Sequence, residues 1–131
     1  MILRTIILLT CIMPTYVFAD LLLFSNDNKF HGCLDCGKYD SDSICNKYYD
    51  YGSKYHSNSI WNKYGIGNRY GYDSPFNKYG NGLKIVDRSG NFYGYFTMSY
   101  NGSRNARNLL ETLWDSAEGD YGRMRDLYCN R

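Results

Sequence analysis

The sequence has little of what most enzymes and nucleic-acid-binding proteins depend on. It contains only two histidines, His31 and His56, and no G-x-S-x-G turn that would present a nucleophilic serine. Its formal net charge is +2, whereas a protein that binds nucleic acid through its phosphates is usually strongly basic. We therefore expect no nucleic-acid partner, and we identify no catalytic residue, no cofactor and no metal ligand.

Aliphatic residues are scarce as well. Hydrophobic residues make up 44% of the 131 residues, but 15 of them are tyrosines, whose hydroxyl needs a partner or water. Between residues 38 and 82 the aliphatic side chains are limited to Ile44, Ile60 and Ile66, so no long helix is expected there. A chain of this length forms one domain, and so thin a core needs covalent support.

The longest apolar run lies near the N-terminus, where residues 6–18 follow Arg4. As a helix this run is too short to span a bilayer core of ~30 Å, and Val17-Phe18-Ala19 fits the small-x-small cleavage rule. We expect residues 1–19 to be a signal peptide and residues 20–131 to form a single exported domain, periplasmic or secreted, without a membrane span. Lipid attachment at Cys11 is a weaker alternative, because Thr10 is a poor residue to precede a lipoprotein cysteine.

After removal of the signal peptide the chain holds an even number of cysteines: Cys33, Cys36, Cys45 and Cys129. In a small exported domain this predicts two disulfides. Every full pairing ties Cys129 to the N-terminal cluster and closes a loop of more than 80 residues, and such a loop contributes ~4.5 kcal/mol in the chain-entropy model. We favour Cys33 or Cys36 as the partner of Cys129. A redox C-x-x-C centre, or a zinc site that adds His31, is disfavoured by turn-like flanks such as His31-Gly32 and by the oxidising compartment.

Three ten-residue copies of one pattern occupy the middle of the chain. Residues 39–48 read YDSDSICNKY, residues 55–64 read YHSNSIWNKY and residues 70–79 read YGYDSPFNKY. We name these the first, second and third copies; they start 16 and then 15 residues apart. The shared pattern Y-x-x-x-S-[IP]-[CWF]-N-K-Y is too regular to arise by chance and indicates tandem repetition.

Each copy offers one side chain that we expect to anchor it in the core: Cys45, Trp61 or Phe76. The asparagine after each anchor readily bonds nearby backbone, which predicts a turn with the following lysine in water. The serine before each anchor can cap a single turn of helix. The whole segment is therefore expected to consist of short extended pieces joined by tight turns and stacked on one another.

The stretch from Phe30 to Gly80 resembles a known family. It carries F-x-G-C-x-x-C-x-x-[YF]-D-x-x-S-I-C-N-x-Y, followed by YGSKY, SIWNKYG and SPFNKYG. This resembles a family of short exported bacterial proteins of unassigned function, with tandem tyrosine, glycine, serine and asparagine units behind a signal peptide. The resemblance implies bacterial origin and export, and it supplies no activity and no site residues. The joint GIGNRYGY before the third copy departs from the usual G-x-Y-G-S-x-Y.

The C-terminal third of the chain carries clearer secondary-structure signals. Residues 83–98 hold two apolar runs around a glycine-containing turn, which predicts a β-hairpin. Ser103 is a good N-cap, an apolar stripe at helical spacing follows it, and Gly119 ends the pattern. A second helix from Asp120 to Tyr128, with Met124, Leu127 and Tyr128 inward, completes a helical part over residues 103–128. The expected fold is a small disulfide-stapled α+β domain with turn-rich repeats.

Three classes of function fit these features. The first is a non-enzymatic binding protein of the bacterial envelope or extracellular space, for which a glycan, another envelope component or a protein is the partner. Its binding surface would be built from exposed tyrosines together with a basic patch on the first helix, which Arg123, Arg125 and Arg131 could extend; the candidates are Tyr55, Tyr64, Tyr70, Tyr79, Arg104 and Arg107. The alternatives are a small exported hydrolase acting through His31 or His56, and a structural protein whose repeats self-associate.

Overall fold

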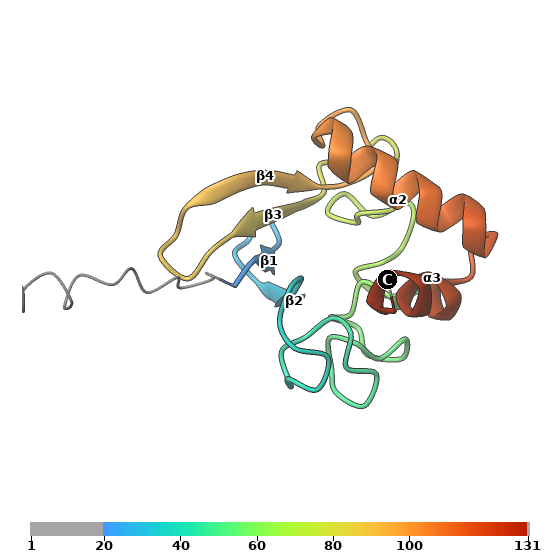
Figure 1. The fold of residues 1–131 in the computed structure, drawn as a ribbon. Helices are drawn as coiled ribbons and strands as arrows, with labels where there is room; N and C mark the ends of the chain where they lie inside the picture. The colour runs from blue at the N-terminus through green and yellow to red at the C-terminus, as the bar shows by residue number, and fades with distance from the viewer. Residues whose placement is uncertain (1–19, 131) are drawn as a thin grey trace, which may run out of the picture.

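The computed structural model describes residues 20–130. The expected signal peptide, residues 1–19, lies outside the described residues. The described chain forms a small α+β domain with a four-stranded sheet, a long turn segment and two C-terminal helices. One disulfide ties the turn segment to the second helix, and the other joins the end of a strand to the residues that follow it. Figure 1 shows the sheet at one side, the two helices at the other and the turn segment running beside the shorter helix.

The sheet is antiparallel throughout. Its strands are β1 (Leu22–Phe24), β2 (Phe30–Cys33), β3 (Leu83–Val86) and β4 (Phe92–Phe96), in the order β2-β1-β3-β4. The hairpin expected over residues 83–98 is β3 and β4, although β4 ends at Phe96. The central pair β1 and β3 joins the N-terminal hairpin to the later hairpin, with Leu23 opposite Ile85.

Strand β2 corrects the expectation that His31-Gly32 is turn-like. Both residues lie in the strand, whose Cys33 pairs with Leu22 of β1. Gly32 has a φ of 109°, and a Cβ atom there would lie 2.6 Å from Cγ2 of Ile44. Glycine is therefore required at this position both for the backbone conformation and for the close approach of the first copy to the sheet.

The helices are α2 (Arg104–Ala117) and α3 (Tyr121–Cys129). The Ser103 hydroxyl accepts a hydrogen bond from the amide of Ala106, which confirms the N-cap, and Gly119 follows the left-handed C-cap residue. Asp120 caps α3 through the amide of Arg123. The expected inward position of Leu127 is wrong, because that side chain is 42% exposed, whereas Met124 and Tyr128 are buried.

The turn segment between β2 and β3 follows a three-residue rhythm. From His56 to Gly80 the amide of every third residue donates to the carbonyl three residues earlier, and the same pattern runs from Gly37 to Tyr49. The rhythm lengthens once, where Ser53 donates to the carbonyl of Tyr49 four residues back. Within residues 34–82 the structure has no strand and no helix, so the expected extended pieces and single helical turns are replaced by consecutive tight turns.

Side chains at the first position of each turn explain this conformation. In all three copies the serine hydroxyl accepts from the amide two residues on, as Ser59 does from Trp61 at 3.1 Å, and the asparagine carbonyl oxygen does the same, as Asn62 does from Tyr64 at 2.9 Å. These Ser and Asx turns satisfy amides that have no sheet or helix partner. The two middle residues of each serine turn point to the core, and those of each asparagine turn point to water.

The four cysteines form two disulfides. Cys45 is bonded to Cys129, 84 residues along the chain, and Cys33 is bonded to Cys36. The favoured pairing of Cys129 with Cys33 or Cys36 is therefore wrong. Ser43 lies opposite Cys33 in an isolated bridge, and the following turn carries Cys45 to the last turn of α3, so Cys45 is the residue of the cluster that the C-terminus reaches.

The core lies between the turn segment and the two helices. Trp61 and Phe76 are 0% and 2% exposed and their ring centroids are 6.2 Å apart. Phe76 also packs edge-on against Tyr121 of α3, with centroids 5.2 Å apart. Contacts between aromatic rings thus provide much of the apolar packing that aliphatic side chains provide in other cores. No helix within residues 20–130 combines the length and the apolar character that crossing a membrane requires.

Candidate functional site: a row of cation–tyrosine pairs

The most regular surface feature is a set of exposed tyrosines, each preceded by a lysine or an arginine. One pair opens and one pair closes each copy, and the tyrosine rings are 79% to 91% exposed; the pairs are Lys38–Tyr39, Lys47–Tyr48, Lys54–Tyr55, Lys63–Tyr64, Arg69–Tyr70 and Lys78–Tyr79. In four pairs the cation lies over its neighbour's ring, at 5.2 to 5.6 Å from the centroid. We call these six the cation–tyrosine pairs.

The turn rhythm places these pairs in solvent. Five of the six tyrosine amides donate to a side chain two residues back: Asn46, Ser53, Asn62, Asn68 and Asn77. The cation and the tyrosine are the two middle residues of the turn and therefore project together from its corner. None of the six tyrosine hydroxyls has a hydrogen-bond partner within residues 20–130, so ring and hydroxyl are both available to a ligand.

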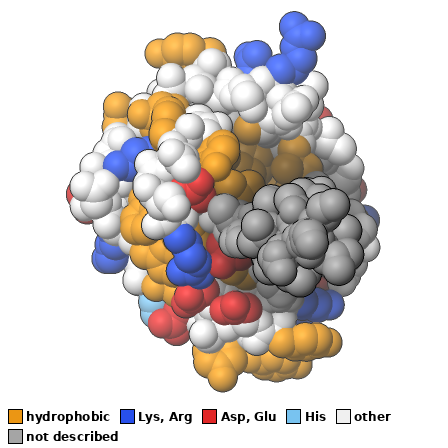
Figure 2. Space-filling view, turned by 60° about the vertical axis from the view of Figure 1, so that its left-hand side comes forward, with side chains coloured by type: hydrophobic (Ala, Val, Ile, Leu, Met, Phe, Trp, Pro, Cys, Tyr) orange, Lys and Arg blue, Asp and Glu red, His pale blue; other side chains and the backbone are white. Residues whose placement is uncertain are grey.

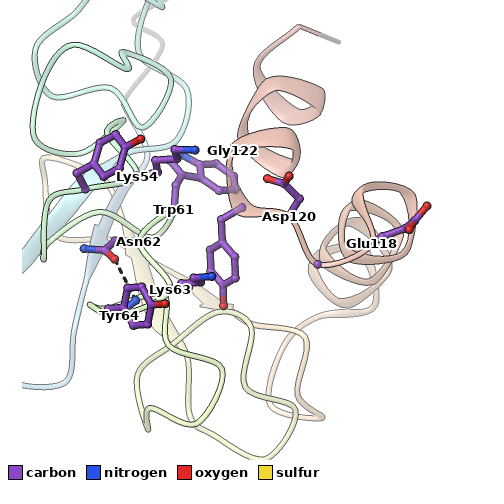
Figure 3. Close-up of a pocket in the computed structure, with 11 residues that line it drawn as sticks. Lys54, Trp61, Asn62, Lys63, Tyr64, Glu118, Asp120 and Gly122 are labelled. Atoms are coloured by element: carbon purple, nitrogen blue, oxygen red, sulfur yellow. Dashed lines mark hydrogen bonds between the residues drawn. The ribbon is translucent and has the colours of Figure 1, made fainter.

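The second copy forms a hollow of about 630 Å³ against the start of α3 (Figure 3). Its inner wall includes the rings of Trp61 and Tyr121, and its rim carries the pairs Lys54–Tyr55 and Lys63–Tyr64. The Lys54 ammonium reaches across, because a Cβ atom on Gly122 would lie 3.7 Å from its Nζ. A volume of this size lies within the range of small-ligand sites, ~300–1,000 Å³.

The first copy forms a second hollow, of about 340 Å³, against the end of α3. Six of its lining residues occupy the same register positions as in the second copy, 16 residues earlier: Lys38, Tyr39, Cys45, Asn46, Lys47 and Tyr48 correspond to Lys54, Tyr55, Trp61, Asn62, Lys63 and Tyr64. Arg125 of α3 donates to the carbonyl of Gly52 at 3.1 Å, between the two copies. The same arrangement of side chains therefore occurs twice along α3.

A third hollow, of about 560 Å³, continues the second one. It shares Lys63, Tyr64 and Tyr121 with that hollow and adds the pair Arg69–Tyr70. The Arg69 guanidinium carbon lies 5.6 Å from the Tyr70 ring centroid and 5.1 Å from the Trp114 ring centroid. The third copy thus contributes its opening pair to the row. Its closing pair, Lys78–Tyr79, lines none of these three hollows.

Some charged side chains around the hollows are held in ion pairs, whereas others are not. Within residues 20–130 ion pairs join Arg88 to Asp20 and Arg125 to Asp126, and no lysine takes part in one. His56 Nε2 lies 3.5 Å from a carboxylate oxygen of Asp50. Of the acidic residues on the helix side, Asp126 holds Arg125 and Asp120 caps α3. Figure 3 shows the Glu118 carboxylate directed away from Trp61. The lysines therefore supply the unneutralised charge at the rim.

Of the six residues expected to form the binding surface, Tyr55, Tyr64 and Tyr70 border the hollows. Tyr79 is exposed elsewhere. Arg104 and Arg107 lie in the first turn of α2, at the opposite end of that helix from α3, and line none of the three hollows described. The Nε atom of Arg107 is buried without a hydrogen-bond partner in the described part of the chain. Of the residues expected to extend this patch, Arg125 is held by Gly52 and Asp126, and Arg131 lies outside the described residues.

The repeat pattern of the sequence does not include the opening cations Lys38, Lys54 and Arg69. The pattern begins at the tyrosine, one residue after each of them, although a basic residue stands at that position in all three copies. Extending the pattern by one residue would have shown that every copy is bracketed by two cation–tyrosine pairs. The hollows themselves could not be found in this way, because their other wall comes from α3.

The two histidines have structural partners. Burial lowers the pKa of His31, which is 3% exposed, and its Nδ1 lies 3.0 Å from the carbonyl oxygen of Asn58, to which it donates. It borders a small hollow with Asp73, whose pKa is raised by burial. The nearby Ser25 hydroxyl donates to Asp27 and not to His31, so no Ser–His pair forms there. His56 accepts from the amide of Asn58 as another turn cap.

Potential metal ligands come together once within residues 20–130. The cluster consists of Asp20, Cys33, Asp35 and Cys36. Both sulfur atoms are bonded to each other, and a disulfide sulfur is not the thiolate that metals bind. The cluster therefore offers only two carboxylates.

Comparison of the chain with protein-family models, with curated proteins and with solved structures gave no match.

Proposed function

We propose that this protein is an exported, non-enzymatic binding protein that captures a component of the bacterial envelope or extracellular space on its row of cation–tyrosine pairs. The observation that carries this proposal is the duplication of the hollow. Two copies place the same six register positions around the same helix. A surface kept only for folding has no need of the eight exposed residues in this set, four cations and four tyrosines, which contribute little to the core.

Export is supported by the two disulfides, which are compatible with an extracellular or periplasmic location. The signal peptide expected from residues 1–19 and the resemblance to exported bacterial proteins point the same way. A binding role agrees with the chemistry of the rim, because tyrosine offers a large contact area with few rotatable bonds. Among the described residues, the histidines that a hydrolase would need are used as a buried donor and a turn cap.

The test is a broad glycan array probed with the mature protein and with two variants. Tyr64→Ala removes a ring shared by two hollows, and Tyr100→Ala removes an equally exposed ring (83% against 84%) that lines none of the three. We expect wild type and Tyr100→Ala to bind the same glycans and Tyr64→Ala to lose them. Identical patterns for all three proteins would contradict a binding role for the row. A concentration-dependent increase in mass by analytical ultracentrifugation, abolished by Tyr64→Ala, would instead indicate self-association.

A further inference from the structure

We propose that the ligand is an acidic linear glycan whose chain crosses the hollows of the first and second copies. This inference rests on the proposed binding function and specifies its ligand class. Three features of the row support it: the hollows repeat, their free charge is positive, and their polar groups suit hydroxyl-rich rings.

Repetition of the site indicates repetition in the ligand. Along α3, the second-copy hollow touches Gly122 and the first-copy hollow touches Arg125, Asp126 and Cys129. These residues are spaced three, four and seven apart, so they share one face of the helix. The nine residues of α3 span only ~13 Å at 1.5 Å per residue. A polymer of small repeating units can therefore occupy both hollows, whereas a single small molecule fills one.

The charge of the ligand follows from which groups are engaged. Lys47, Lys54 and Lys63 lie at the rim over their own tyrosine rings and make no ion pair within residues 20–130. Each is therefore free to meet an anionic group beside the ring that it covers. On the opposite wall, Asp126 is neutralised by Arg125. A ligand with one acidic group for every one or two units matches two lysines in each hollow.

Hydroxyl-bearing rings fit the remaining groups better than nucleotides do. The free tyrosine hydroxyls can donate and accept along the row, and the Asp120 carboxylate adds an acceptor to the second-copy hollow. A phosphodiester chain carries a charge on every nucleotide and gains affinity from a continuous basic track. Here the Glu118 and Asp120 carboxylates on the helix side interrupt the basic residues of the second-copy hollow, so the row is not such a track. Sugar hydroxyls, in contrast, can donate to carboxylates.

The experiment measures binding of the mature chain by titration calorimetry to four probes: polygalacturonate, dextran sulfate, unmodified dextran and oligo(dT). We expect salt-sensitive binding to polygalacturonate or dextran sulfate, and the comparison of these two tells carboxylate from sulfate recognition. Affinity for dextran and oligo(dT) should be at least tenfold weaker. Dextran binding that depends on Tyr64 would overturn the acidic class and leave the binding function standing. Tighter binding of oligo(dT), or no binding of any probe, would also overturn the inference.

Matched lysine variants locate the site. Lys63→Ala should weaken binding of the acidic glycan by ~10-fold or more, as loss of one charge-assisted hydrogen bond does. Lys78→Ala changes the same residue type in a pair outside the hollows and should stay within twofold of wild type. Lys47→Ala, in the first copy, should weaken binding of the polymer and leave binding of free galacturonate to the second copy unchanged, because only the polymer spans both hollows. Equal losses for Lys63→Ala and Lys78→Ala would show nonspecific charge attraction and contradict the inference.

Discussion

The Trp61 indole Nε1 donates a hydrogen bond of 2.7 Å to the carbonyl oxygen of Ile44. This contact fastens the anchor of the second copy to the backbone of the first, and both residues are fully buried. The ring also lies 6.2 Å, centroid to centroid, from Phe76 of the third copy and 6.2 Å from Tyr128 of α3. Trp61 thereby joins all three copies to the C-terminal helix.

Replacing Trp61 should cost a large part of the stability of this domain. Trp61→Ala is expected to lose ~3–5 kcal/mol, as buried aromatic residues generally do. Trp61→Phe keeps a ring but leaves the Ile44 carbonyl unpaired, which costs ~1–3 kcal/mol. Lys63→Ala, an exposed neighbour, should stay within ~0.5 kcal/mol of wild type. Thermal melts of the three variants test this, and an unchanged Tm for Trp61→Ala would rule out an anchoring role.

The two disulfides should contribute unequally. Cys129→Ala opens the bond that spans 84 residues and is expected to cost ~2–5 kcal/mol. Cys36→Ala opens a bond between residues three apart, for which the chain-entropy model gives only ~2 kcal/mol. Urea unfolding of both variants gives the order. Mass spectrometry of unreduced protein produced under oxidising conditions provides a separate check, because two or more free thiols would contradict the pairing.

Tyr121 should make the domain sensitive to alkaline pH. Its hydroxyl donates to the carbonyl of Gly67 at 2.6 Å, and burial raises the pKa of Tyr121 from 10.0 to about 12. Because the folded pKa lies above the unfolded one, the stabilisation is complete below pH 10 and is lost as pH rises from 10 towards 12. Tyr121→Phe should lower stability at neutral pH and reduce this alkaline loss. Unfolding curves at pH 8 and pH 11 measure both effects, with the exposed Tyr100→Phe as control.

Close backbone packing between turns makes one glycine indispensable. A Cβ atom on Gly67 would lie 2.1 Å from the carbonyl oxygen of Ile60, whereas nothing lies within 4 Å of a Cβ atom on Gly37. Gly67→Ala should therefore destabilise the domain by at least the ~1–3 kcal/mol typical of overpacking. Gly37→Ala should be neutral to within ~0.5 kcal/mol. Circular dichroism melts of the pair compare the two positions directly, and equal melting temperatures would contradict the steric argument.

The features that the sequence predicted are those encoded locally. Ser103 and Gly119 mark the ends of α2 because capping depends on residues within one turn of the helix. The even number of cysteines predicted two disulfides, but the choice of Cys45 as partner depended on where the first copy leaves β2. Strand β2 was missed because its four residues include Gly32, and its pairing with β1 becomes clear only when the sheet is assembled.

The candidate site likewise combines features that are encoded locally with features that depend on distant parts of the chain. The tyrosines of the row could be nominated from the sequence, because a repeated polar turn exposes its corners. Their grouping into hollows depends on α3, which lies more than 50 residues further along the chain than Lys63. Arg104 and Arg107 were nominated from charge alone, and charge does not reveal which end of a helix meets the repeats.

Because the turns repeat every three residues, the position of a residue within its turn determines whether its side chain faces the core or water. Serine turns send their corner residues inward and asparagine turns send theirs outward. Deletion of one three-residue turn would therefore move a lysine and a tyrosine towards the core and an anchor into water. The 15-residue step between the second and third copies is five whole turns, and the 16-residue step before it contains the one lengthened turn, at Tyr49 to Ser53. Whole copies could therefore be gained or lost without inverting the surface, and each gain would add two exposed cation–tyrosine pairs.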